Sequence, residues 1–201
     1  MGMMLQDSLR APVTRLITPI CRGLLHLGVS ANAITVVGAL FTLVASVFTF
    51  PQGHFLVGTI LIVVFVLFDL LDGTMARISQ KGESNWGALL DSTLDRLIDA
   101  VIVGSVLWYL ISKSDPLVPL VLITALLGFL ISYIKARSES LGIPCEGGLA
   151  ERSERLILIL VTTGAVGLGI PFAMAIGFWI LAIASLITVG QRLLIVYKGD
   201  K

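Results

Sequence analysis

Charged residues are scarce in this sequence: only 13% of its 201 residues are Asp, Glu, Lys or Arg, whereas soluble domains usually carry roughly 25%. Hydrophobic residues make up 56% of the chain, and the mean hydropathy is +0.98. This composition excludes an ordinary soluble domain and indicates an integral membrane protein. The formal net charge of +1 gives no electrostatic footprint for nucleic acid, so no nucleic-acid partner is expected.

Cysteine is also rare, and a secretory signal is missing. Cys21 and Cys145 fall in segments that we expect on the cytoplasmic side, which predicts reduced thiols rather than a disulfide. Residues 1–28 lack an uninterrupted apolar core because arginines interrupt it, and this excludes a signal peptide. We predict instead an amphipathic helix lying in the membrane interface, with an ordinary solvated helix as the alternative. Its apolar residues recur at helical spacing: Val13, Leu16, Ile17, Ile20, Leu24 and Leu27.

Long apolar segments separated by short polar turns fill the remainder of the chain. We predict an all-α membrane bundle that forms a single domain over residues 1–201. In this bundle the interfacial helix of residues 1–28 precedes six transmembrane helices within residues 33–197. The predicted spans are residues 33–50, 55–78, 86–112, 117–137, 156–168 and 172–197.

The basic residues predict how this bundle is oriented. With six spans, almost all of the Lys and Arg residues fall on one side of the membrane, and Lys113 is the exception. Because basic residues accumulate on the cytoplasmic side, both termini and the turn after the second span should face the cytoplasm.

Two pairs of aspartates are surrounded by apolar residues. Asp69 and Asp72 end the second predicted span, and Asp91 and Asp95 open the third. Spacings of three and four residues place each pair on one face of a helix. A carboxylate inside a membrane costs about 3 kcal/mol, and four carboxylates at close range cannot all stay ionised without cations between them. We therefore predict a cation site on the cytoplasmic side.

The ligands available to this cation are oxygens alone. Such a set suits Mg²⁺ or Mn²⁺, and these ions are usually shared with the phosphates of a substrate. Small residues beside the acids, among them Gly73 and Gly87, allow a bulky ligand to approach the backbone. The pattern predicts a phosphate-bearing substrate held by one or two metals. Alternatively, the acids pair with Arg77 and Arg96 or line an ion path.

A basic constellation surrounds the loop between the fourth and fifth predicted spans, within ISYIKARSESLG and GGLAERSERL. Arg152 and Arg155 share a helix face if the fifth helix begins early, whereas Lys135 and Arg137 do not share one. Guanidinium groups match phosphate oxygens, so a phosphate site for a second, water-soluble substrate is one interpretation, with Ser132 beside it. Membrane topology and contacts with lipid headgroups are the other.

The aspartate segment resembles the signature of the CDP-alcohol phosphatidyltransferase family, and every fixed position of that signature is filled. The pattern is Asp69-x-x-Asp72-Gly73-x-x-Ala76-Arg77 followed by Gly87-x-x-x-Asp91-x-x-x-Asp95. Asp99 lies outside the signature, and we expect it to pair with Arg96 or another base inside the bundle. The resemblance covers essentially the whole chain.

The resemblance implies a reaction in which a phosphatidyl group passes from CDP-diacylglycerol to an alcohol and CMP leaves. It implies two Mg²⁺ or Mn²⁺ ions in the active site, with Asp95 also taking the proton from the attacking hydroxyl. The implied metal ligands are Asp69, Asp72, Asp91 and Asp95. The residues expected to contact CDP-diacylglycerol are Asn32, Thr35, Gly73, Ala76, Arg77, Ser84 and Gly87.

The segments SYIKARSESLG, ERSERL, TRLITPICRGLL and NAITVVG look like the actinobacterial branch of the family, which makes phosphatidylinositol phosphate. This likeness implies inositol 1-phosphate as the acceptor and a homodimer in a bacterial plasma membrane, in contact with membrane lipids. The implied acceptor-phosphate residues are Ser132, Lys135, Arg137, Arg152 and Arg155. Glycerol 3-phosphate, the acceptor of a phosphatidylglycerophosphate synthase, is also anionic and stays open.

Two other functional classes use buried acids in a membrane. A membrane prenyltransferase would show an Asn-rich first motif and would not need the Gly73, Arg77 and Gly87 set. A non-enzymatic ion carrier should place acids in several other spans, but the interiors of the first, fifth and sixth predicted spans have none. Metal-dependent release of CMP separates these two classes from the transferase.

Overall fold

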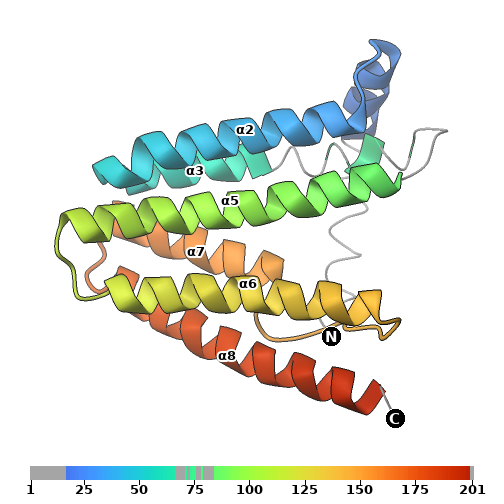
Figure 1. Cartoon of the computed structure of the whole chain (residues 1–201). Helices are drawn as coiled ribbons and strands as arrows, with labels where there is room; N and C mark the ends of the chain where they lie inside the picture. The colour runs from blue at the N-terminus through green and yellow to red at the C-terminus, as the bar shows by residue number, and fades with distance from the viewer. Residues whose placement is uncertain (1–16, 67–70, 72, 76–77, 79–83, 200–201) are drawn as a thin grey trace. The chain divides into compact units, whose positions relative to one another are not determined.

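The computed structural model describes residues 17–66, 71, 73–75, 78 and 84–199 (Figure 1). Within these residues all regular structure is helical, which confirms the predicted all-α class. The helices with full bounds are α2 (Ala31–Thr49), the 3-10 helix η1 (Phe50–Gln52), α3 (Phe55–Val66), α5 (Asn85–Ser112), α6 (Val118–Ser140), α7 (Arg152–Gly167) and α8 (Ala173–Gly199). Residues 17–26 are helical as well.

The described helix ends lie close to the predicted boundaries, with one difference, and most of residues 67–78, where the second predicted span ends, lie outside the described residues. The fifth predicted span starts at residue 156, but α7 already begins at Arg152, after Glu151 in an extended conformation. The two arginines of this polar first turn contact Asp99, as described below. Glycines in the left-handed region follow the ends of α6 and α7, where Gly142 and Gly169 have φ angles of 79° and 78°.

Three helices in the described chain are long and apolar enough to cross a membrane, which supports the membrane assignment: Ala31–Gln52, Val118–Ser140 and Ala173–Gly199. Helix α5 has sufficient length, but it contains four charged residues, so its composition differs from that of a simple span: Asp91, Asp95, Arg96 and Asp99. The prediction of six spans stays a prediction.

The chain divides into two compact units, residues 1–45 with 61–98 and residues 46–60 with 99–201. The core of the first unit is a cluster formed by the buried side chains of Cys21, Ile34 and Met75. The thiol of Cys21 donates a hydrogen bond to the carbonyl oxygen of Leu71 at 3.6 Å. Burial raises the pKa of this thiol, which favours its protonated form.

The helix of residues 17–26 uses its apolar residues in two different ways. Ile17 and Leu24 pack against the Cys21 cluster, which belongs to the protein interior. Ile20, and Leu27 just after the helix, are 55% and 81% exposed, so these two side chains do not pack into the described protein interior. The apolar stripe predicted to face the membrane interface is thus partly a packing surface, and interfacial binding stays a prediction.

In the second unit α8 packs against both α6 and α7. Helices α7 and α8 approach closely because Gly177 of α8 lies against the side chain of Thr162, where a Cβ atom would overlap it. The hydroxyls of Thr59 and Thr163 share a hydrogen bond of 2.7 Å, which links α3 to α7 within this unit. These contacts hold α6, α7 and α8 together, and these three helices carry the basic residues of the second unit that are described below.

Candidate active site

The beginning of α5 brings together three residues that were predicted to contact the nucleotide. Ser84 precedes the helix and caps it, since its Oγ accepts a hydrogen bond of 3.0 Å from the backbone N–H of Gly87. A Cβ atom at Gly87 would lie 3.1 Å from both this oxygen and Oδ1 of Asn32. Asn32 stands in the first turn of α2, so the starts of α2 and α5 meet at a glycine in the first unit.

Two further predicted nucleotide residues lie in the first unit. Thr35 is half-buried on α2, and its hydroxyl donates to the carbonyl oxygen of Ala31 at 3.2 Å. Gly73 is helical, and in the described part of the chain a Cβ atom there would meet no other atom within 4 Å. Close approach of a ligand to the backbone of Gly73 stays a prediction. Ala76 and Arg77 lie outside the described residues.

Asp91 and Asp95 stand one helical turn apart on α5, so they share a face as predicted. Asp91 is exposed, whereas the side chain of Asp95 is only 14% exposed and lies 3.8 Å from Nη2 of Arg96. Within the residues that the structure describes, three metal-ligating side chains do not gather at one point. Asp69 and Asp72, which complete the predicted ligand set, lie outside those residues.

Arg152 and Arg155 at the start of α7 share one carboxylate. Nη2 of Arg155 donates to Oδ2 of Asp99 at 3.2 Å, and Nε of Arg152 lies 3.9 Å from Oδ1 of the same group. The expected pairing of Asp99 with a base inside the bundle is therefore confirmed for two bases of α7. Arg155 is buried, and Arg152 is half-buried with its side chain 25% exposed.

The other predicted acceptor residues lie on α6. The ammonium group of Lys135 is 3.8 Å from Glu139, and its side chain is 44% exposed. Arg137 is exposed and donates to Ser140 at 3.3 Å. The hydroxyl of Ser132 donates to the carbonyl oxygen of Gly128 at 3.0 Å. Lys135 and Arg137 engage different neighbours, as their spacing predicts.

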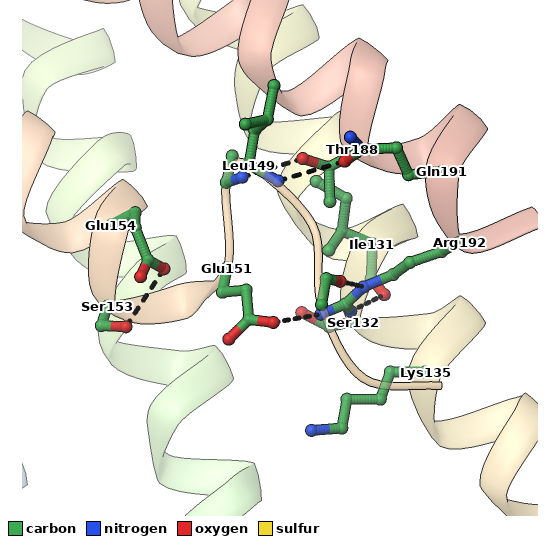
Figure 2. A network of polar contacts seen from close by, with 12 residues as sticks. Ile131, Ser132, Lys135, Leu149, Glu151, Ser153, Glu154, Thr188, Gln191 and Arg192 are labelled. Atoms are coloured by element: carbon green, nitrogen blue, oxygen red, sulfur yellow. Dashed lines mark hydrogen bonds and ion pairs between the residues drawn. The ribbon is translucent and has the colours of Figure 1, made fainter. Parts of the chain in front are cut away.

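Arg192 of α8 is a buried arginine that the sequence interpretation treated only as a marker of topology. Its Nη1 donates to the carbonyl oxygen of Ile131 at 2.8 Å and its Nε to that of Gly147 at 3.2 Å. Its Nη2 lies 4.0 Å from the carboxylate of Glu151 (Figure 2). Arg192 therefore ties α8 to α6 and to the loop before α7.

Two neighbours of Arg192 bind the same loop. Thr188 accepts a hydrogen bond of 2.8 Å from the N–H of Ala150, and Gln191 accepts one of 3.2 Å from the N–H of Leu149 (Figure 2). Gly148 has a φ angle of 133° and lies against Thr188, so the loop approaches α8 as closely as its paired glycines allow. The signal in the sequence is polar residues spaced i, i+3 and i+4 in an apolar helix.

Comparison with known proteins gives a consistent result over nearly the whole chain. The family model of the CDP-alcohol phosphatidyltransferases matches residues 28–190. Phosphatidylinositol phosphate synthase of Mycobacterium tuberculosis (strain H37Rv) is 41% identical over 191 residues, which cover 92% of this chain and 87% of that protein. The synthase of Streptomyces avermitilis is 42% identical over 205 residues, with coverages of 97% and 83%.

Solved structures agree with the sequence comparison. The crystal structure of the Mycobacterium tuberculosis phosphatidylinositol phosphate synthase with CDP-DAG bound has a TM-score of 0.86 and 40% sequence identity, and it covers 91% of this chain and 94% of its own. The structure of the same enzyme with manganese and citrate has a TM-score of 0.84 and 40% identity, with coverages of 90% and 88%.

Proposed function

Since the chain belongs to the CDP-alcohol phosphatidyltransferase family, we propose that it transfers the phosphatidyl group of CDP-diacylglycerol to inositol 1-phosphate and releases CMP. The observation that carries the choice of acceptor is the arginine pair of α7, Arg152 and Arg155, which is held by one aspartate. Such a pair can bind an acceptor that carries a phosphate monoester, because guanidinium groups match phosphate oxygens. The relatives named phosphatidylinositol phosphate synthase support inositol 1-phosphate in particular.

The acceptor phosphate is bound in this proposal by the guanidinium group of Arg152, together with Arg155 and Lys135. Ser132 and Arg137 complete the set, and of these five residues Arg155 is the most firmly fixed by protein contacts. Guanidinium groups form paired hydrogen bonds with phosphate oxygens, which orients the alcohol as well as binding it.

Asp69, Asp72, Asp91 and Asp95 would hold divalent metal ions against the diphosphate of CDP-diacylglycerol. The donor set fits, because carboxylate oxygens without any His or Cys suit hard cations such as Mg²⁺ and Mn²⁺. A related enzyme contains manganese in its crystal structure. Bound metals would neutralise the negative charge of the diphosphate. We propose two ions per site.

The reaction itself is a displacement at the phosphorus that bears the diacylglycerol. A hydroxyl oxygen of the acceptor forms a new bond to this phosphorus, and the bond to the CMP phosphate oxygen breaks. We assign to Asp95 the role of the base that takes the hydroxyl proton, which its half-buried carboxylate on α5 can accept. Most of the rate would come from positioning and charge neutralisation rather than from covalent chemistry.

The nucleotide would be bound by the group at the starts of α2 and α5, namely Asn32, Ser84 and Gly87, with Thr35 on the same face of α2. Arg77 and Ala76, by their place in the signature, would contact a phosphate and leave room beside it. Gly73 supports this assignment because the described chain leaves its backbone accessible.

Placement in the membrane follows from the same proposal. We infer six spans with both termini, the aspartates and the arginine pair on the cytoplasmic side of the plasma membrane, where the soluble acceptor and CMP are found. The helix of residues 1–28 would lie in the interface. The enzyme would act as a homodimer. The match of the family model favours this transferase over the membrane prenyltransferase and the ion carrier.

CMP release by the purified full-length protein in detergent tests the proposal. CDP-diacylglycerol and Mg²⁺ are supplied with inositol 1-phosphate, glycerol 3-phosphate or free inositol, one at a time. We expect release with inositol 1-phosphate and its loss in Asp95→Asn. Release with glycerol 3-phosphate alone would keep the reaction class and replace the acceptor, and no release with any acceptor or metal would contradict the transferase assignment.

A further inference from the structure

Asp99 stands outside the family signature, yet it contacts both arginines at the start of α7. Its Oδ2 accepts a hydrogen bond of 3.2 Å from Nη2 of Arg155, and its Oδ1 lies 3.9 Å from Nε of Arg152. One carboxylate of α5 therefore bridges two guanidinium groups that are three residues apart on α7. The signature explains neither this carboxylate nor its two partners.

Electrostatics oppose two arginines in the first turn of a helix. The N–H groups at a helix N-terminus carry partial positive charge, so cations are unfavourable there, and like charges three residues apart also repel each other. The side chains of Arg152 and Arg155 are only 25% and 7% exposed, so water screens this repulsion poorly. Asp99 places a negative charge beside both guanidinium groups and so offsets this repulsion.

The two arginines are not held equally. Arg155 has a second anchor, since its Nη1 donates to the carbonyl oxygen of Ala150 at 3.1 Å. It also lies against Gly128 of α6, where a Cβ atom would be 3.4 Å from its Nε. Arg152 is less buried, and its Nε lies 3.9 Å from Oδ1 of Asp99. Two arginines and one aspartate leave a formal charge of one positive unit, which still attracts an anion.

We propose that Asp99 is a positioning residue for the acceptor substrate. It orients the guanidinium groups of Arg152 and Arg155 so that they meet the phosphate of the acceptor alcohol, and it acts through them rather than by touching the substrate. This inference rests on the proposed function, because it assigns the arginine pair to an acceptor phosphate. Without a positioning role, the negative charge of Asp99 would only weaken the attraction of the two arginines for that phosphate.

The variant Asp99→Asn keeps the shape of the side chain and removes its charge. With CDP-diacylglycerol and metal saturating, we expect the KM for the acceptor to rise on the order of tenfold or more, as the loss of a charge-assisted hydrogen bond implies. The KM for CDP-diacylglycerol and the kcat at saturating acceptor should stay within about twofold. Asp99→Glu retains the carboxylate and should raise the acceptor KM by a smaller factor.

The matched control is Glu154→Gln, since Glu154 lies in the same first turn of α7 but is exposed and bonded to Ser153 (Figure 2). Its KM values should match those of the unchanged protein. In an Arg155→Gln background, Asp99→Asn should raise the acceptor KM by a smaller factor than in the unchanged protein, because one of the two arginines through which Asp99 acts is already lost. The acceptor KM of the double variant therefore separates a positioning role of Asp99 from a general loss of structure.

Three outcomes would overturn the proposal: an acceptor KM at or below that of the unchanged protein in Asp99→Asn, an equal rise in both KM values, or full additivity with Arg155→Gln. The same measurements run unaltered if glycerol 3-phosphate proves to be the acceptor, because it also carries a phosphate monoester. That result would contradict the proposed acceptor, and the KM values for glycerol 3-phosphate would still test the role of Asp99. CMP release with free inositol alone would contradict both the proposed acceptor and the positioning role of Asp99.

Discussion

Gly87 lies so close to Asn32 that a Cβ atom at position 87 would stand 3.1 Å from the amide oxygen of Asn32. The same Cβ atom would stand 3.1 Å from the hydroxyl oxygen of Ser84, which caps α5. A methyl group here would have to move two polar side chains by a few tenths of an ångström. Glycine at this place therefore protects the arrangement of the side chains around it.

Gly87→Ala should weaken the use of CDP-diacylglycerol while leaving the fold intact. We expect the KM for CDP-diacylglycerol to rise by roughly tenfold, since displaced polar contacts are worth about 1 kcal/mol each. Steady-state CMP release at varied CDP-diacylglycerol measures it. Gly104→Ala is the control on the same helix, because a Cβ atom there would meet nothing within 4 Å in the described structure. Equal kinetics for the two variants would contradict the nucleotide assignment.

Gly73→Ala separates a structural role from a functional one. Gly73 is helical, so alanine should stabilise the helix by about 0.5–1 kcal/mol if packing alone mattered. The proposed approach of the nucleotide to this backbone predicts the opposite for activity, a loss on the order of tenfold or more in kcat/KM. Thermal unfolding and CMP release are measured on the same preparation. A stabilised and fully active Gly73→Ala would exclude close approach of the substrate here.

Removal of divalent metal should abolish CMP release, and Mg²⁺ or Mn²⁺ should restore it, because four carboxylates are proposed to hold the ions. Asp91→Asn should require a higher metal concentration for half-maximal activity. Asp95→Asn should lose on the order of 10²-fold or more in kcat at every metal concentration, since the base is lost as well as a ligand. If excess metal restored Asp95→Asn fully, Asp95 would be a ligand only.

Gly177→Ala should destabilise the contact between α7 and α8. Its methyl group would overlap the side chain of Thr162, and forced overpacking typically costs about 1–3 kcal/mol. Gly190→Ala on the same helix is the matched control, because the described chain leaves open space there. Thermal unfolding in detergent should show a lower Tm for Gly177→Ala alone. Similar Tm values would mean that the two helices can separate slightly at no cost.

Apolar runs and the turns between them were sufficient to predict the helices, because each run is long and ends at polar or glycine-containing segments. The sequence predicted a span from residue 156 and left an earlier start of its helix open, since the arginines of the first turn of α7 do not follow an apolar period. Both arginines contact Asp99, which is more than fifty residues away along the sequence. A partner so distant is not visible in local spacing.

The candidate site likewise contains residues that the sequence predicted and one buried arginine that it did not. The proximity of Asn32, Ser84 and Gly87 agrees with residues singled out by a family resemblance, and Asp91 and Asp95 follow from helical periodicity. Arg192 was missed because a lone arginine near the end of a span is usually a topology marker. Its role depends on the carbonyl oxygens of Ile131 and Gly147, and backbone acceptors leave no trace in a sequence.

The bonds from α8 to the loop before α7 also impose an order on biosynthesis. Thr188, Gln191 and Arg192 follow this loop in the sequence, yet they hold Gly147, Leu149 and Ala150 in place. Translation therefore makes the loop about forty residues before the side chains that bind it. A nascent chain that stops short of Thr188 has the whole loop but none of these three anchors.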